Sequence, residues 1–240
     1  MTHADPSTTT RALALRASSE LSDSSRKRRS VRSGATKQWQ PPEGLAPEDV
    51  LAVIDAAATE RDRLMVRVLW ATGARISEVL ALRPMDVRRD SLVLPNLKNP
   101  SRGTKRVFLP AGQVDLPGEL LLWARERELA DDQPLFFSRK RAIGGQRRPI
   151  TRQQAWEIVR AAADRADVRV LALRASRYGP AGEPAPVHPH LFRHARVRQI
   201  VRTTRSLPIA QKQAGWSRLQ MAYLSVSDEE VRAAMQVVKD

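Results

Sequence analysis

The spacing of apolar residues predicts helices in the region that follows residue 41. Over residues 46–59, and again from Arg61 onward, apolar side chains recur every three or four positions, as they do on a helix with one buried face. The second helix should end at Gly73, because glycine readily adopts the left-handed backbone of a helix C-cap. A third helix is expected from Ile76 and should stop before Pro84, since proline disfavours a helical conformation in the residue before it.

The pattern then changes to short β-like runs between residues 91 and 109. Apolar residues at 92–94 and 107–109 flank a shorter run at 97–98, and turn-forming residues occupy 99–103. Such runs, separated by a turn, predict a small antiparallel sheet.

Helical spacing returns in the second half of the chain. Helices are expected at 117–130, 151–166, 190–203 and 208–214, and from residue 228 onward. Thr151 and Ser227 are the expected N-caps of two of them, and the Pro- and Gly-rich stretch 174–187 is expected to be a loop. The predicted fold class is therefore α+β: mainly α, with a small antiparallel β-sheet.

Residues 1–40 differ from the rest of the chain. They are rich in Ser, Thr and Arg, lack a sustained apolar period, and contain the basic run Arg26, Lys27, Arg28 and Arg29. We interpret them as a basic arm that stays disordered until it meets DNA, with a solvated tail of no role as the alternative. Residues 41–240 are predicted to form a single domain.

Charge and composition narrow the classes of partner. The 240 residues hold 41 Lys and Arg against 26 Asp and Glu, giving a formal charge of +15. A positive charge spread along the chain favours a polyanionic partner over a protein that is merely basic and soluble. There are no cysteines, which excludes disulfides and thiolate chemistry. No apolar stretch approaches the roughly 20 residues that span a membrane, so we expect a cytoplasmic, nucleoid-associated protein.

Two blocks of sequence carry a resemblance to a known family. The first is Ala71-Thr72-Gly73-Ala74-Arg75-Ile76-Ser77-Glu78-Val79-Leu80-Ala81-Leu82. The second is His190-Leu191-Phe192-Arg193-His194, followed by Ala214-Gly215-Trp216 and Tyr223-Leu224. Together they resemble box I and box II of the tyrosine recombinase, or phage integrase, family. The resemblance implies that family's catalytic-domain fold. It also implies cleavage and rejoining of DNA strands through a covalent 3′-phosphotyrosyl link, without metal, ATP or cofactor.

The resemblance assigns roles to cationic residues. Arg75 and Arg193 fall on the two positions that clamp the scissile phosphate, and a planar guanidinium matches two phosphate oxygens at once. A lysine on a β-hairpin protonates the leaving 5′ oxygen in the family. Lys98 matches by location and Lys105 is the rival, since the length of the turn allows the alignment to slip.

The remaining catalytic positions fall on His190, Trp216 and Tyr223. His190 takes the family's histidine position, as a general base or a phosphate-orienting group. Trp216 stands where most members have histidine; its indole N–H can donate a hydrogen bond but cannot shuttle a proton, and core packing is its alternative role. Tyr223 is the expected nucleophile, although it lies seven residues after Trp216 where the family more often has nine.

Further residues are expected to support this set. Glu78 matches the acidic position of box I, and His194 is expected to support the site or to pack. His188, His190 and His194 also allow a zinc interpretation, which the absence of cysteine and of a His-Glu-x-x-His pattern disfavours. Lys105, Arg196 and the basic arm are the expected DNA contacts.

The expected partner is double-stranded DNA, bound by a homotetramer on two DNA sites. An accessory DNA-binding protein is a further candidate partner. Most family members carry an N-terminal core-binding domain, and roughly 40 polar residues stand in its place here. Two alternatives stay open: a type IB topoisomerase, which shares the chemistry but relaxes DNA, and a non-catalytic DNA-binding relic of a recombinase.

Overall fold

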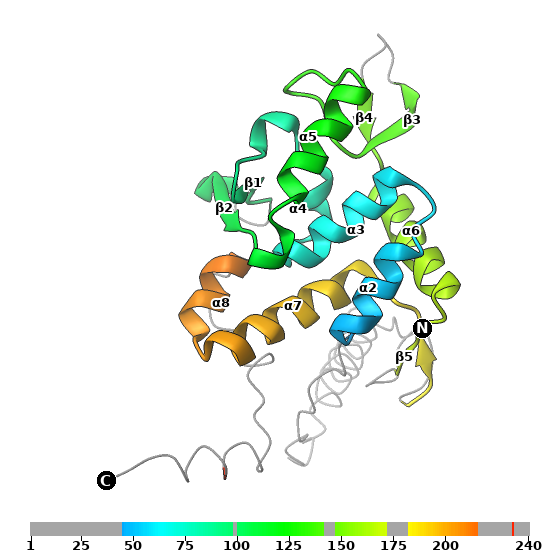
Figure 1. The fold of residues 1–240 in the computed structure, drawn as a ribbon, viewed down its shortest axis with the longest axis vertical. Coiled ribbons are helices and arrows are strands. Elements are labelled where there is room, and N and C mark those ends of the chain that lie inside the picture. Colours follow the sequence, from blue (N-terminus) through cyan, green and yellow to red (C-terminus); the bar gives the residue numbers. More distant parts are fainter. Residues whose placement is uncertain (1–44, 98–99, 142–146, 172–181, 216–231, 233–240) are drawn as a thin grey trace, which may run out of the picture. The chain divides into compact units, whose positions relative to one another are not determined.

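The computed structural model describes residues 45–97, 100–141, 147–171, 182–215 and 232. They belong to one compact unit, Trp39–Asp240 (Figure 1). The predicted basic arm and the helix expected from residue 228, with its Ser227 cap, lie outside the described residues.

The described residues are mainly helical, and their strands pair only in antiparallel hairpins, which confirms the predicted fold class. The helices are α2 (Pro47–Asp55), α3 (Glu60–Thr72), α4 (Ile76–Leu80), α5 (Leu116–Glu126), α6 (Arg152–Arg165), α7 (Pro189–Thr204) and α8 (Leu207–Ala214). The strands are β1 (Ser91–Pro95), β2 (Thr104–Phe108), β3 (Phe137–Arg141), β4 (Arg147–Pro149), β5 (Val170–Leu171) and β6 (Pro184–Ala185).

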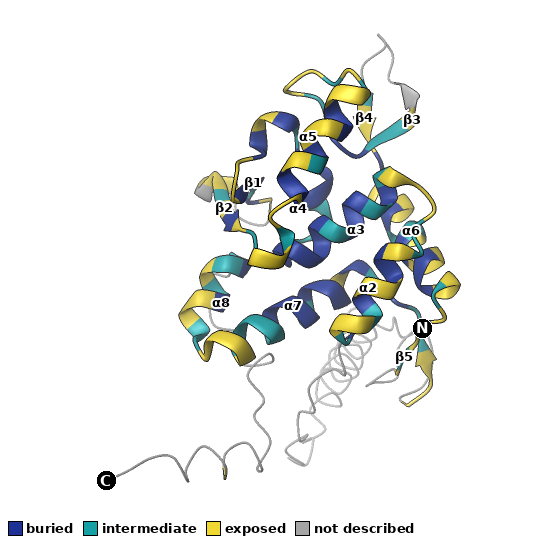
Figure 2. Ribbon diagram, viewed as in Figure 1, coloured by how far each residue is buried: buried dark blue, intermediate teal, exposed yellow. Residues whose placement is uncertain are grey.

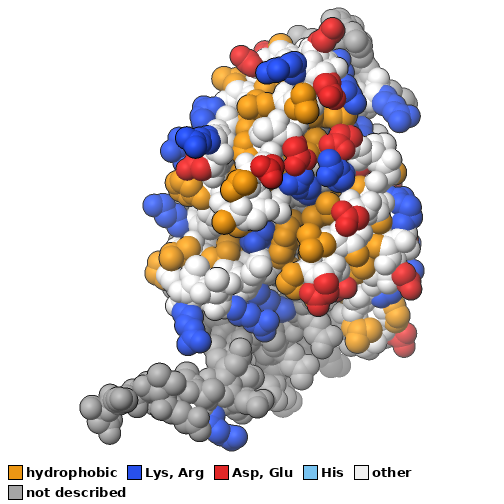
Figure 3. Space-filling model, viewed as in Figure 1, with side chains coloured by type: hydrophobic (Ala, Val, Ile, Leu, Met, Phe, Trp, Pro, Cys, Tyr) orange, Lys and Arg blue, Asp and Glu red, His pale blue; other side chains and the backbone are white. Residues whose placement is uncertain are grey.

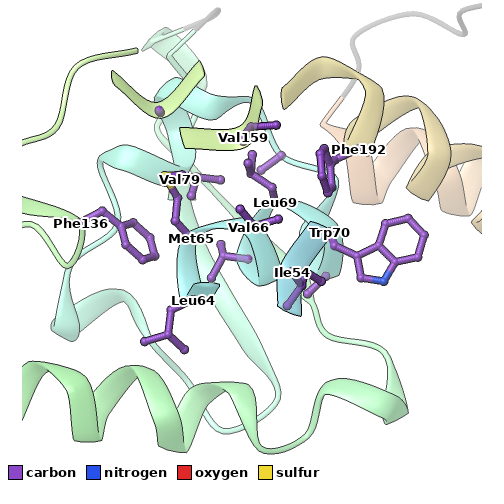
Figure 4. Packing of buried hydrophobic residues seen from close by; sticks show 14 of the residues in the cluster. Ile54, Leu64, Met65, Val66, Leu69, Trp70, Val79, Phe136, Val159 and Phe192 are labelled. Atoms are coloured by element: carbon purple, nitrogen blue, oxygen red, sulfur yellow. The ribbon is translucent and has the colours of Figure 1, made fainter. Parts of the chain in front are cut away.

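Helix α3 is the centre of the core. Thr59 caps its first turn by accepting a hydrogen bond from the backbone N–H of Asp62 at 3.2 Å, and Gly73 ends it with the predicted left-handed backbone, at φ 60°. The helix packs against α2, α4, α5 and α7 and is buried on almost every side (Figure 2). Its apolar side chains lie between Phe136 on one side and Phe192 of α7 on the other (Figure 4). A helix enclosed in this way gives the residues that follow Gly73 a rigid base.

The β1–β2 hairpin confirms the sheet predicted between residues 91 and 109. In its register Leu92 pairs with Val107 and Leu94 with Lys105. Leu92, Leu94 and Val107 are fully buried against the helices. The run predicted at 97–98 is not a described strand: Leu97 lies in a turn, and Lys98 is outside the described residues.

Two further hairpins, β3–β4 and β5–β6, were not predicted. Strands β5 and β6 are each two residues long, and β3 contains Phe137 as its one apolar residue, so neither pair shows an alternating apolar pattern. Strand β6 falls inside the stretch 174–187 that was expected to be a loop.

The surface carries both signs of charge. On the face drawn in Figure 3, Lys and Arg are interspersed with Asp and Glu among apolar patches. No helix within the described residues is long and apolar enough to cross a membrane.

Candidate active site

Arg75 is placed by the turn between α3 and α4. Gly73 reverses the chain in the left-handed conformation, and Arg75 is the N-cap residue of α4. Three residues later, Glu78 accepts hydrogen bonds from the Arg75 backbone N–H and from its Nη1, each at 3.0 Å. A carboxylate at the third helical position can reach back to the cap in this way. The arginine is therefore fixed at its backbone and at its guanidinium by one side chain.

Glu78 binds two of the cations of the site, Arg75 and Lys105. Its side chain is 0% exposed, and its second oxygen accepts from Lys105 Nζ on β2 at 2.7 Å. Burial alone would raise the pKa of Glu78, but the hydrogen bond and charge of Lys105, together with the hydrogen bonds from Arg75, outweigh it and lower the pKa. Glu78 is thus an anion at neutral pH that holds two cations side by side.

Arg193 joins this group from α7. Only 1% of the residue is exposed, and its guanidinium donates to the backbone oxygens of Gly73 at 2.6 Å and Ala214 at 2.9 Å. Lys105 Nζ also donates to the Ala214 oxygen, at 3.4 Å. The two carbonyls connect the α3–α4 turn, the start of α7, the hairpin and the end of α8 at one point.

Lys105 is partly buried next to three charged side chains, those of Glu78, Arg193 and Arg75. Burial lowers its pKa, and the positive charges of Arg193 and Arg75 act in the same direction, against the opposing effect of Glu78. Its side chain is 11% exposed. A lowered pKa makes the ammonium group a better proton donor than a lysine in water.

The histidines of α7 begin the next part of the site. His190 is exposed and its ring meets that of His194 edge to face, with centroids 4.4 Å apart. The pKa of His190 is lowered to about 4, first by partial burial and then by its neighbours Arg193, His188 and Arg75. The pKa of His194 is lowered to about 3, again mainly by burial. Both rings are therefore neutral at pH 7, and the described residues contain no cluster of metal-ligating side chains.

A hollow of about 720 Å³ lies beside His190. Its lining comes from the starts of three helices: Ile76 of α4, residues 151–153 and Trp156 of α6, and residues 188–190 of α7. The hollow was not predicted, because its lining residues are far apart in the sequence and each looks like an ordinary helix start.

Arg196 lies in the interior of the protein. Its Nε donates to the Trp70 backbone oxygen at 2.6 Å, its guanidinium stands 4.0 Å from the centroid of the Trp70 ring, and 6% of the residue is exposed. We expected it to contact DNA, but these contacts favour a role in packing α7 on α3.

The structure brings together Arg75, Glu78, Lys105, Arg193, His190 and His194. Other members of the predicted set lie outside the described residues: Arg26, Lys27, Arg28, Arg29, Lys98, Trp216 and Tyr223. Trp216 follows directly on Gly215, the left-handed C-cap of α8.

A signal for Lys105 was present in the sequence. Side chains two positions apart in a strand point to the same face, so Lys105 shares a face with the buried Val107. That periodicity indicates an inward-pointing lysine rather than a surface contact.

The sequence matches the model of the phage integrase family over residues 43–230. It is 26% identical over 185 residues to the tyrosine recombinase XerD of Ralstonia nicotianae. The match covers 75% of the present chain and 53% of that XerD. The sequence is 24% identical over 200 residues to transposase A of transposon Tn554 from Staphylococcus aureus. This match covers 78% of the present chain and 50% of the transposase. The chain thus spans about half the length of the curated relatives it matches.

Solved structures share the fold. The XerA recombinase is similar with a TM-score of 0.61 and 18% identity, over 87% of this chain and 68% of that one. A lambda integrase tetramer bound to a Holliday junction is similar with a TM-score of 0.56 and 16% identity. The match covers 82% of the present chain and 51% of the integrase chain. With most of its length matched by the family model, and Arg193 of box II hydrogen-bonded to the Gly73 carbonyl of box I, this chain belongs to the phage integrase family of tyrosine recombinases.

Proposed function

We propose that this chain cleaves and rejoins DNA strands through a covalent link between Tyr223 and the 3′ phosphate. The observation that carries the proposal is that Arg75 and Lys105 bind Glu78, while Lys105 and Arg193 bind the Ala214 carbonyl. The charges of Arg193 and Arg75 also help to lower the pKa of the nearby His190. Such a set of fixed cations is suited to a phosphate that gains negative charge in the transition state.

In the proposed step the Tyr223 oxygen attacks the phosphorus and the bond from phosphorus to the 5′ oxygen breaks. Arg75 and Arg193 balance the charge on the non-bridging oxygens, and Trp216 donates an N–H to one of them. The proton of Tyr223 passes to a neutral base, for which His190 is the candidate. Lys105 gives its proton to the 5′ oxygen, and the reverse of these transfers joins the strand again.

We choose Lys105 over Lys98 as the proton donor. Lys105 stands 2.7 Å from Glu78, in the same carboxylate-centred group as Arg75, and its pKa is lowered. A general acid works best when its pKa approaches the operating pH, which supports Lys105 in this role.

The proposed substrate is double-stranded DNA and the proposed working assembly is a homotetramer on two DNA sites. The hollow beside His190, with Arg152, Gln153 and Trp156 in its lining, is the proposed place for the DNA next to the scissile phosphate. The lambda integrase tetramer on a Holliday junction, similar in fold, supports this assembly.

The test is recovery of covalent protein–DNA adducts. The wild-type chain is incubated with a labelled library of duplexes that carry random sequence and a nick, so that the cleaved fragment escapes and the adduct accumulates. Denaturing gels and sequencing then identify adducts and the sites where they form. We expect adducts with wild type, none with Tyr223→Phe, and a strong decrease with Lys105→Ala but not with Lys98→Ala.

Further outcomes separate the alternative activities. Equal yields of adduct from Tyr223→Phe and wild type would exclude catalysis by Tyr223, and the chain would then be a non-catalytic DNA-binding relic. Relaxation of supercoiled plasmid without resolution of a Holliday junction built from the recovered sites would favour a type IB topoisomerase.

A further inference from the structure

Gly215 touches the side chain of Lys105. It ends α8 in the left-handed conformation, at φ 66°, and a Cβ at this position would lie 2.8 Å from Lys105 Cδ and 3.0 Å from its Nζ. Carbon atoms that are not bonded normally approach to about 3.5–4.0 Å. No side chain fits here unless the lysine moves.

The lysine is enclosed by three groups at this point. Its Nζ donates to Glu78 at 2.7 Å and to the Ala214 oxygen at 3.4 Å, while its Cδ and Cε lie within 3.5 Å of where a Cβ of residue 215 would stand. A lysine side chain is flexible, and holding it in one place costs rotamer entropy. The two hydrogen bonds fix the ammonium group, and the bare Cα leaves room for the stem.

We propose that Gly215 is a positioning residue for Lys105, and that the missing side chain at the end of α8 sets where the ammonium group stands. The proposal rests on the proposed function, in which Lys105 protonates the 5′ oxygen. Helix α8 thereby aligns the proton donor on the β1–β2 hairpin with Arg193, because the Ala214 carbonyl receives hydrogen bonds from both side chains.

The chain offers a matched control for the backbone requirement. Gly103 also has a left-handed backbone, at φ 61°, but a Cβ there would meet nothing within 4 Å. Alanine at either position carries the same kind of backbone strain, because an L side chain disfavours the left-handed conformation. Only alanine at Gly215 also displaces Lys105, so the pair separates the contact from the strain.

The experiment compares two DNA substrates made from a site at which the wild type forms adducts. One has the natural 5′ oxygen at the cleaved bond, and the other has sulfur there, which leaves as a thiolate without needing a proton. The full chain, Gly215→Ala, Gly103→Ala and Lys105→Ala are compared by the rate of adduct formation on both.

We expect Gly215→Ala to slow adduct formation on oxygen DNA by roughly 10- to 100-fold, as when a catalytic group is displaced by about 1 Å. On sulfur DNA we expect a decrease of less than about threefold, because no general acid is needed. Lys105→Ala should show the same selectivity more strongly, and Gly103→Ala should stay within about threefold of wild type on both substrates. A slowdown by Gly215→Ala that is equal on both substrates, or absent on oxygen DNA, overturns the proposal.

Failure of the proposed function gives a different result. If the wild type forms no adduct on any duplex, or if Lys105→Ala loses no rate on oxygen DNA, Lys105 is not the proton donor and Gly215 positions no catalytic group.

A double-mutant cycle covers the case in which Gly215→Ala folds poorly. The melting temperature is measured for Gly215→Ala alone and in a Lys105→Ala background. We expect a smaller loss in that background, because the side chain that the new Cβ meets is gone. An equal loss of melting temperature in both backgrounds would show that backbone strain alone destabilises Gly215→Ala. It would overturn the proposed contact between residue 215 and Lys105.

Discussion

Replacement of Glu78 by glutamine tests the centre of the site most directly. Glutamine keeps the shape of the side chain but removes its charge, and its NH2 group cannot accept a hydrogen bond. One oxygen of Glu78 binds Arg75 at 3.0 Å and the other binds Lys105 at 2.7 Å. In Glu78→Gln one of these two cations therefore faces an N–H donor and loses its partner.

The expected cost follows from burial. Breaking a buried ion pair by removing one partner costs about 3–5 kcal/mol. Glu78 is 0% exposed, but Arg75 is 26% exposed and Lys105 11%, so part of each cation's charge remains solvated. We therefore expect the lower end of that range, about 3 kcal/mol. For a domain of this size, that corresponds to a fall of roughly 6–12 °C in melting temperature.

The assay is urea unfolding followed by circular dichroism, with the melting temperature as a second readout. The matched control is Glu60→Gln, because Glu60 also pairs with an arginine three residues away, Arg63 at 2.7 Å, but is 45% exposed. An exposed pair contributes about 0–1 kcal/mol. If Glu78→Gln cost no more than Glu60→Gln at pH 7, the buried carboxylate would not be holding the site together.

The pH dependence has a defined sign. The pKa of Glu78 is lowered in the folded protein, so its stabilising contribution is complete above the unfolded pKa of about 4.3. The contribution is lost as the pH falls through the folded pKa, which lies lower still. The difference in stability between wild type and Glu78→Gln should therefore stay constant from pH 7 to pH 5 and shrink in more acidic buffer.

Three other substitutions or titrations give independent checks. Arg196→Ala should lower the free energy of unfolding by about 2 kcal/mol, because the buried Trp70 carbonyl loses its donor and the Trp70 ring loses the stacked guanidinium. It should leave the salt dependence of DNA affinity unchanged, and a slope smaller by about one would instead indicate a phosphate contact. His190 followed by NMR should titrate near pH 4, so the free energy of unfolding should fall as the pH drops from about 6.5 to 4; a midpoint near 6.5 would show that neither burial nor the neighbouring cations lower its pKa. Gly73→Ala should cost about 1–2 kcal/mol, since the residue has φ 60° and a Cβ would lie 3.1 Å from Arg196, whereas Gly112→Ala, with nothing within 4 Å, should be neutral in the same melts.

Local signals in the sequence predicted the elements that carry the site. The cap at Gly73 and the N-cap at Thr151 were both predictable, because each depends on the residue itself and on neighbours within four positions. Helix α2 is shorter than the predicted range 46–59, since a fading apolar pattern does not mark where a helix frays.

Strand periodicity in the sequence indicates that Lys105 points inward, but it does not show that the lysine reaches Glu78. The register of the hairpin decides that Lys105 faces the helices. That register is set by the burial of Leu92, Leu94 and Val107, which exists only once the hairpin packs on the core. The burial of Arg196 could not be predicted either, because the Trp70 ring on which it stacks belongs to a helix far away in the chain.

The sequence by itself determined the fold class, the family and the position of Arg75 at a glycine turn, because motifs and caps are contained in short stretches. Only the tertiary structure decided that Glu78 binds both Arg75 and Lys105, and that Gly215 lies against the lysine stem. These contacts join residues 27 and 110 positions apart in the chain, from Glu78 to Lys105 and from Lys105 to Gly215. No local preference specifies such pairs, since they form only when the packing of α3 brings the hairpin and α8 to the same side of the core.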